Sequence, residues 1–267
     1  MDLTLIWTTV LIGVVEGLTE FLPVSSTGHV ILAAELLKFQ GPPGKVFEIV
    51  IQFGAILAVC FLYRQKIWNT AAGVLRRDRP AMRFAIAIVL AFLPAAIIGV
   101  VAHKYIKSVL FNPTVVAIAL IVGGVVILIV ERFAQRPRIK SIDDVDLKTA
   151  LLIGLCQCLA MVPGVSRAGA TIMGARVFRV DRATATEFSF FLAMPTMLGA
   201  TVYDLYKNWS VLSWDGGGVI ALGFVVAFVS AALVVRAFVA FISRHGFAVF
   251  AWYRIAIGSI ALILLSF

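Results

Sequence analysis

Two short stretches of the chain place charged, hydroxyl and imidazole side chains inside otherwise apolar sequence. In chain order these side chains are Glu16, Glu20, Ser26 and His29 in the first stretch, and Ser166, Arg167 and Thr171 in the second. Carboxylates and imidazole can transfer protons, and a serine hydroxyl beside them can act as a nucleophile. Arginine presents a planar fork of donors that suits phosphate or carboxylate. The combination indicates chemistry on an anionic substrate.

Glu16 and Glu20 form an acidic pair spaced i, i+4, which places both carboxylates on one helix face, where like charges repel. In an apolar helix a charged side chain costs on the order of 2.5–3.5 kcal/mol even on the gentlest insertion scale. Protonation, Arg167 or a bound divalent cation can compensate this cost, and two carboxylates suit Mg²⁺ or Ca²⁺. A salt bridge that only ties two parts of the chain together is the structural alternative.

Ser26 and His29 are three residues apart, so they share one face of a helix that begins at the preceding turn. We therefore expect them to act together, although a lone histidine is more often a satisfied core residue. Ser25 and Ser26 in the first stretch and Ser166 in the second are expected to cap the helices that follow. Two such helix N-termini that face each other form an anion site.

The two stretches belong to a sequence repeat. Residues 11–31 and 152–172 align without a gap at an offset of 141 residues and are identical at eight positions. In each copy an apolar run is broken at a proline, Pro23 or Pro163, and a serine-containing turn leads into a second apolar run. Because paired broken segments in a membrane protein are the best sequence indicator of a binding site, we expect both stretches to share one site.

The composition is that of an all-α integral membrane protein, since 61% of the residues are hydrophobic and only 14% are charged. The net charge of +9 comes from basic residues that gather in short loops. This is the positive-inside signal, and it argues against a nucleic-acid partner. Cys60, Cys156 and Cys158 lie in apolar runs without metal-site spacing, so we expect free thiols. The first apolar run lacks a basic flank, so we expect no cleaved signal peptide.

Six apolar runs are long enough to cross the membrane as helices, namely residues 47–63, 84–102, 114–131, 187–203, 219–241 and 248–266. Two broken segments, 5–37 and 149–177, are expected to be re-entrant. In that topology 15 of the 23 Lys and Arg residues lie in loops on one face, and five lie in the opposite loops 38–46, 103–112 and 204–216. If both broken segments crossed instead, the split would be 12 against 8, so charge favours re-entry of the second segment.

Three spans per repeat give an odd number of crossings, so the second repeat is expected to be inverted relative to the first. We predict one membrane domain over residues 1–267, with repeats at about 1–140 and 141–267, six transmembrane helices and two re-entrant helical hairpins. The hairpins should enter from opposite sides and meet near the middle of the bilayer.

Several other polar residues have simpler interpretations. Arg236 and Arg254 lie close enough to helix ends for their side chains to reach the membrane surface. Tyr253 is typical of the aromatic belt at a membrane interface. Glu48 and Gln52 are weaker candidates for the surroundings of the site.

Four segments resemble the undecaprenyl-diphosphate phosphatase family, also called the bacitracin-resistance proteins. They are EGLTEFLPVSSTGH at 16–29, FEIVIQFGAILAV at 47–59, PGVSRAGAT at 163–171 and EFSFFLAMPTMLGA at 187–200. The resemblance implies inverted repeats with re-entrant helices in a bacterial inner-membrane enzyme that acts on the periplasmic side. Such an enzyme removes the terminal phosphate from undecaprenyl diphosphate, recycles the lipid carrier for the cell wall and confers bacitracin resistance. Many members have a serine where this chain has Ala168, so a hydroxyl there is not expected to be catalytic.

By motif, the resemblance implies two groups of site residues. The catalytic group is Glu16, Glu20, Ser26, His29 and Arg167, and the phosphate-binding group is Ser25, Thr27, Ser166, Arg167 and Thr171. Ser26, or a water that it positions, would attack, and His29 would act as general base or acid. Glu16 and Glu20 would orient His29 or hold a divalent cation that bridges the diphosphate. A phosphoserine intermediate and direct attack by water both stay open.

The expected partners are the lipid substrate and the membrane, with no nucleic acid, and a homodimer stays open. The alternative function is a carrier, either a flippase for the lipid phosphate or an anion transporter, because secondary transporters also use inverted repeats and broken helices. Ser26 and His29 beside an acidic pair favour an enzyme, since binding alone does not require a reactive set.

Overall fold

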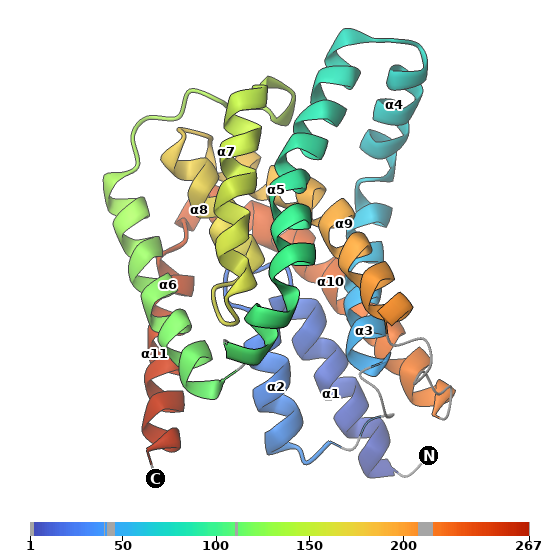
Figure 1. Cartoon of the computed structure of the whole chain (residues 1–267), viewed down its shortest axis with the longest axis vertical. Coiled ribbons are helices and arrows are strands. Elements are labelled where there is room, and N and C mark those ends of the chain that lie inside the picture. The colour runs from blue at the N-terminus through green and yellow to red at the C-terminus, as the bar shows by residue number, and fades with distance from the viewer. Residues whose placement is uncertain (1–2, 40, 42–45, 110–111, 208–215, 267) are drawn as a thin grey trace.

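The structure is a computed structural model that describes residues 3–39, 41, 46–109, 112–207 and 216–266, with the backbone alone for 102–109 and 207. The described residues form helices and no named β-strand (Figure 1). The helices are α1 (Leu3–Thr19), α2 (Ser26–Leu36), α3 (Val46–Leu62), α4 (Arg64–Leu75), α5 (Arg79–Val109), α6 (Pro113–Phe133), η2 (Ile142–Asp144), α7 (Leu147–Gln157), η3 (Cys158–Met161), α8 (Arg167–Val177), α9 (Arg182–Lys207), α10 (Gly217–His245) and α11 (Ala248–Leu265). The prediction of an all-α membrane protein is confirmed at this level.

Five described helices are long and apolar enough to cross a membrane, and the number is six if α3 and α4 are one span bent by 71°. Each predicted span falls on one of α3, α5, α6, α9, α10 or α11. The segment 64–83, which lies between the predicted spans 47–63 and 84–102, contains α4, because Arg64–Leu75 has helix-forming residues and no proline. Parts of the predicted loops 38–46, 103–112 and 204–216 lie outside the described residues.

The two broken segments form the pairs α1–α2 and α7–α8, whose turns approach each other between the long helices. In Figure 1, α1 and α2 lie in the half of the molecule that holds both termini, and α7 and α8 lie in the half that holds α4. Both turns contain a serine with a positive φ angle, 72° at Ser25 and 74° at Ser166. Such backbone is strained for a residue with a side chain and persists only where the surroundings hold it.

Asp146 determines where the second broken segment begins. Its Oδ1 accepts a hydrogen bond from the Thr149 N–H at 2.9 Å, and its Oδ2 accepts one from the Thr149 hydroxyl at 2.8 Å. These bonds satisfy N-terminal donors of α7, and the bond from the Thr149 N–H lowers the pKa of the Asp146 carboxyl.

Arg254 holds both turns, and the prediction that its side chain reaches the membrane surface is wrong. The side chain is fully buried in α11. Its guanidinium donates hydrogen bonds of 2.9–3.2 Å to the carbonyl oxygens of Pro23, Ala119, Leu120, Gly164 and Val165. Pro23, Gly164 and Val165 lie in the broken turns, which leave their carbonyls without helical partners, and a buried polar group must be paired. Ala119 and Leu120 belong to α6, so the same guanidinium also ties the turns to that helix. Gly123 on α6 leaves room for the guanidinium, because a side chain there would occupy the same space.

We predict that Arg254→Met lowers the free energy of unfolding by at least about 3 kcal/mol, because it removes the donor from several buried carbonyls at once. The matched control is Arg236→Met, since Arg236 is exposed on α10 and its replacement should change stability by no more than about 0.5 kcal/mol. Unfolding in detergent measures both variants. Equal losses would contradict the assignment of Arg254 as the residue that holds the turns.

Candidate functional site

The turns of the two broken segments meet at a polar cavity of about 130 Å³. Its lining comes from both turns and from α3, η3 and α9, and consists of Glu20, Ser25, Ser26, Thr27, Gln52, Ala160, Gly164, Ser166, Arg167 and Met197. Most of the residues predicted for the site therefore surround one space, although the two stretches are more than a hundred positions apart in the sequence. Gln52 lines the cavity as expected, whereas Glu48 is exposed elsewhere on α3.

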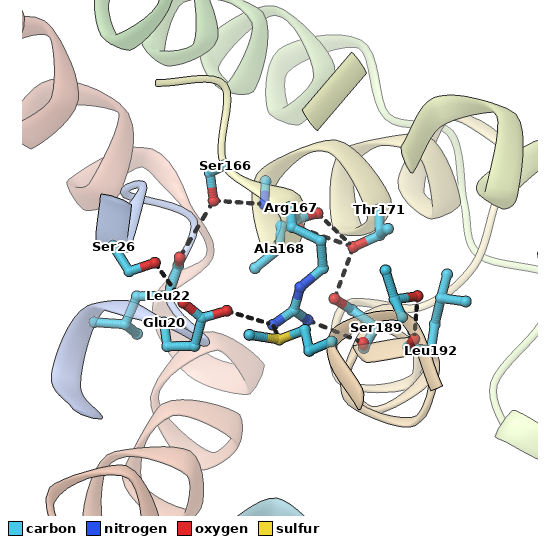
Figure 2. A network of polar contacts seen from close by, with 12 residues as sticks. Glu20, Leu22, Ser26, Ser166, Arg167, Ala168, Thr171, Ser189 and Leu192 are labelled. Atoms are coloured by element: carbon cyan, nitrogen blue, oxygen red, sulfur yellow. Dashed lines mark hydrogen bonds and ion pairs between the residues drawn. The ribbon is translucent and has the colours of Figure 1, made fainter. Parts of the chain in front are cut away.

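An ion pair between Arg167 and Glu20 joins the two turns at this cavity (Figure 2). The Arg167 Nη2 lies 3.0 Å from the Glu20 Oε1, and the two side chains are 12% and 5% exposed. The other carboxylate oxygen of Glu20 accepts a hydrogen bond from the Ser26 hydroxyl. Acid, hydroxyl and guanidinium thus form one connected group, in which a nucleophile and a proton acceptor already touch.

Three further contacts hold Arg167. Its Nη1 donates to the Ser189 carbonyl oxygen at 3.3 Å, its Nη2 also donates to the Met197 sulfur at 3.1 Å, and its guanidinium lies 5.4 Å from the centre of the Phe21 ring. Ser189 and Met197 belong to α9, within the segment 187–200 that resembles the family, but sequence reasoning gave neither residue a role in the site. Their contacts leave the guanidinium at the cavity surface without enclosing it.

Thr171 lies behind the cavity and does not line it. Its hydroxyl is fully buried, contacts the Ser189 hydroxyl at 2.7 Å and lies 2.9 Å from the Arg167 carbonyl oxygen (Figure 2). Thr171 therefore fastens α8 to α9 at the level of Arg167. This geometry favours a role for Thr171 in positioning Arg167 over the direct contact with phosphate that the sequence predicts.

The two helix N-termini at the cavity differ in their caps. The Ser166 hydroxyl accepts a hydrogen bond from the Gly169 N–H at 3.1 Å, so the predicted cap of α8 is confirmed. The Ser25 side chain makes no such bond, and Ser26 donates to Glu20, so the predicted caps of α2 are wrong. The first N–H groups of α2 are left without a side-chain acceptor and are available to an anion.

His29 points away from Ser26, toward α11. Its Nδ1 lies 2.8 Å from the Ser25 carbonyl oxygen, which can only accept, so Nδ1 carries the proton in the neutral ring. Its Nε2 then accepts from the Tyr253 hydroxyl at 2.7 Å, and the two rings are stacked. The described residues give no contact between Ser26 and His29, and Tyr253, interpreted as a belt aromatic, is the partner that sequence reasoning missed. A spacing of three puts residues on neighbouring parts of a helix but does not fix where their side chains turn.

Glu16 is buried beside this group, with 4% of its surface exposed, and its Oε1 has no hydrogen-bond partner among the described residues. The described part of the chain brings together no group of three or more His, Cys, Asp or Glu that could hold a metal alone. Two carboxylates, one with an unpaired oxygen, fit Mg²⁺ or Ca²⁺ only if the remaining ligands come from water or from substrate oxygens.

Comparisons with known proteins agree with the motifs. A family model described as bacitracin resistance protein BacA matches residues 9–260. An undecaprenyl-diphosphatase 2 of Paramagnetospirillum magneticum is 58% identical over 255 residues, which cover 96% of this chain and 97% of the relative. An undecaprenyl-diphosphatase of Acinetobacter baumannii is 56% identical over 256 residues, with coverages of 96% and 94%. One of Sphingopyxis alaskensis is 52% identical over 259 residues, with 97% of each chain covered.

The ion pair at the cavity can be tested through stability alone. We predict that Glu20→Leu and Arg167→Met each lower the free energy of unfolding by about 3–5 kcal/mol, because each leaves a buried charge without its partner. The double variant should lose less than the sum by roughly 1–3 kcal/mol. The control is the exposed pair Lys66–Asp143, where the same cycle should give less than about 1 kcal/mol. Additive losses at Glu20 and Arg167 would show that the pair is not coupled.

Proposed function

The chain belongs to the bacitracin resistance protein BacA family, and from this premise we propose that it hydrolyses undecaprenyl diphosphate to undecaprenyl phosphate and inorganic phosphate. This reaction recycles the lipid carrier for cell-wall synthesis and gives resistance to bacitracin. The observation that carries the proposal is the contact of Ser26 and Arg167 with the same carboxylate at the cavity. Hydrolysis of a phosphoric anhydride needs a nucleophile, a proton acceptor and a cation for the phosphate oxygens, and this group supplies all three.

We propose that Arg167 binds the terminal phosphate, together with the open N-terminus of α2 and the hydroxyls of Ser25, Thr27 and Ser166. Arginine suits this role because its fork donates two parallel hydrogen bonds to phosphate oxygens. An incoming phosphate would compete with Glu20 for the Arg167 donors. Once the guanidinium turns to phosphate, Glu20 loses its positive partner and becomes a better proton acceptor for Ser26.

The proposed attack proceeds from this arrangement. The Ser26 oxygen, or a water that it positions, forms a bond to the terminal phosphorus, and its proton passes to Glu20. The anhydride bond breaks in line with the attack, and undecaprenyl phosphate leaves with the bonding electron pair. In the covalent route, water then cleaves the phosphoserine, releases inorganic phosphate and restores the hydroxyl.

The contacts of His29 suggest a different role from the general base expected from the sequence. Both ring nitrogens are engaged, one with the Ser25 carbonyl oxygen and one with the Tyr253 hydroxyl. We therefore assign His29 as a positioning residue that helps to hold the strained turn at Ser25, and assign proton acceptance to Glu20, which touches Ser26.

A divalent cation, Mg²⁺ or Ca²⁺, is part of the proposal. Glu16 would hold it through the unpaired Oε1, with the other ligands from water and substrate oxygens, because Glu20 is assigned to proton acceptance. When bound, the ion would neutralise charge on the diphosphate oxygens.

We further propose a topology of six spans and two re-entrant hairpins arranged as inverted repeats in the bacterial inner membrane. Support comes from the opposite halves of Figure 1 in which α1–α2 and α7–α8 lie, and from the left-handed serines at the offset of 141 residues. The basic segment around α4 lies at the end opposite to the termini (Figure 1), which by the positive-inside rule supports a cytoplasmic location for that end. The first hairpin would then enter from the periplasm, where the cavity would open.

Phosphate release in detergent tests the proposed function and separates it from the alternative carrier. We expect the purified protein to release inorganic phosphate from undecaprenyl diphosphate in micelles, where no gradient exists. Glu20→Ala and Arg167→Ala should each lower the rate by about 10²–10³, because each removes transition-state stabilisation or proton acceptance. A flippase or anion transporter would release no phosphate under these conditions, and that result would overturn the proposal.

The nucleophile has its own test. With substrate labelled in the terminal phosphate and a rapid acid quench, we expect label on the wild-type chain and on His29→Ala, but none on Ser26→Ala. The reason is that only Ser26 offers a hydroxyl bonded to a carboxylate at this cavity. Absence of label from every variant, with turnover intact in the wild type, would favour direct attack by water.

A further inference from the structure

A second and larger cavity, of about 440 Å³, adjoins the polar cavity. It lies between α5, η3 and α9, and it shares Ala160 and Arg167 with the polar cavity. A molecule whose phosphate contacts Arg167 in the first cavity can therefore extend into the second without crossing solvent.

The lining of the second cavity is mainly apolar and reaches the lipid-facing surface of the helices. Phe92, Ala95 and Gly99 contribute from α5, and Met161 contributes from η3. At its edge Val100 is 64% exposed and Ala200 is exposed, so the cavity opens between α5 and α9 where the bilayer would lie. An apolar chain can enter this opening directly from the membrane.

Two side chains that line this cavity, Arg167 and Gln157, each have a buried nitrogen without a hydrogen-bond partner among the described residues. Gln157 is only 2% exposed, and its Nε2 has no hydrogen-bond partner among the described residues. Its Oε1 lies 3.4 Å from the Thr196 hydroxyl, which makes a shorter bond of 2.7 Å to the Leu192 carbonyl oxygen. Whichever way the amide is turned, at least one N–H stays unpaired, and a buried unpaired donor is costly unless a ligand accepts from it.

We propose that this cavity holds the first isoprene units of the substrate, and that the Gln157 amide donates a hydrogen bond to the phosphate that stays on the lipid. The proposal rests on the proposed function and adds the position of the prenyl chain. The terminal phosphate lies at Arg167, the inner phosphate lies at the junction of the two cavities within reach of Gln157, and the chain leaves between α5 and α9. In a bilayer the chain gains no hydrophobic energy from entering protein, so the cavity acts by orienting the scissile bond.

Another apolar cavity, of about 530 Å³, does not fit this role. It lies between α6, η3 and α8, with Gly123, Cys156 and Met173 in its lining, and it shares no lining residue with the polar cavity. A chain lying there would have no continuous route from the phosphate at Arg167.

Gly99 and Gly199 allow the second cavity to be filled without disturbing the helices. A Cβ atom at Gly99 would meet its nearest neighbour at 3.9 Å, and one at Gly199 would meet Phe92 at 3.7 Å, which are ordinary contacts. Gly99→Leu and Gly199→Leu therefore fill space that a prenyl chain would use. The matched control is Gly217→Leu at the start of α10, where no atom lies within 4 Å.

The experiment compares kcat/KM in detergent for isopentenyl, geranyl and farnesyl diphosphates. We expect the wild type and Gly217→Leu to favour the longer chains. Gly99→Leu and Gly199→Leu should lose at least about tenfold on farnesyl diphosphate and stay within about twofold on isopentenyl diphosphate. Gln157→Leu should lose about tenfold on all three substrates and keep the preference for chain length, because its partner is the phosphate.

The outcomes separate the two proposals. If the wild type releases phosphate from no diphosphate, including undecaprenyl diphosphate, the proposed function fails. If the wild type is active and both glycine variants keep its preference for chain length, the chain does not lie in this cavity and the inference is overturned. Equal losses on the short and the long substrate in both glycine variants would also overturn it, because the substitutions would then act on the phosphate site. Unchanged kinetics in Gln157→Leu would show that the Gln157 amide does not bind the phosphate that stays on the lipid.

Discussion

Backbone that breaks inside a membrane must have every buried carbonyl paired, and in this protein Arg254 meets that requirement for both broken turns at once. Its guanidinium bonds Pro23 in the first turn and Gly164 and Val165 in the second. The same bonds fix the distance between the turns, so the polar cavity depends on a residue that does not line it. Without this donor, water would have to enter to satisfy the carbonyls, and the turns could separate. The charged guanidinium of Arg254 therefore serves to hold the two turns in place.

Arg167, the arginine at the polar cavity, is held by fewer contacts than Arg254 and is partly exposed. Arg167 has one strong partner, Glu20, and two weaker ones, a carbonyl oxygen at 3.3 Å and a thioether sulfur. A buried ion pair contributes little net stability, because desolvation offsets most of the attraction, but it holds both charges at the site until another anion arrives. An incoming phosphate can replace Glu20 on the guanidinium without leaving Arg167 uncompensated. In the proposed reaction this exchange frees the Glu20 carboxylate beside Ser26, so phosphate binding and activation of the hydroxyl would be coupled through one ion pair.

The sequence predicts the all-helical membrane fold, the helices that carry the six apolar runs and the cap at Ser166, because hydrophobic length and local chemistry determine these features. It does not predict the absent cap on α2, because the Ser26 hydroxyl bonds to Glu20 instead, and such a contact leaves no local signal in the sequence. The contacts of Arg254 and Tyr253 are not predicted from the sequence for a related reason. Their partners are backbone carbonyls and a histidine far away in the chain, and no periodicity or motif records those contacts. The contact between Glu20 and Arg167 is predicted from the sequence only because both residues lie in the repeat and carry opposite charges.

The two aligned stretches differ in their polar residues, which fits the proposal that only the first supplies the reactive carboxylate and hydroxyl. At the offset of 141 residues, Glu16 aligns with Gln157, Glu20 with Met161 and Ser26 with Arg167. A second acidic pair would add two buried carboxylates near Glu16 and Glu20, where the single guanidinium of Arg167 could not compensate all four. Replacement of the second pair by an amide and a thioether removes that repulsion and leaves hydrogen-bonding and apolar surface in its place. In the proposed reaction the first segment supplies the attacking group, and the second supplies the positive charge. Through Gln157 and Met161 the second segment also supplies part of the lining of the adjoining apolar cavity.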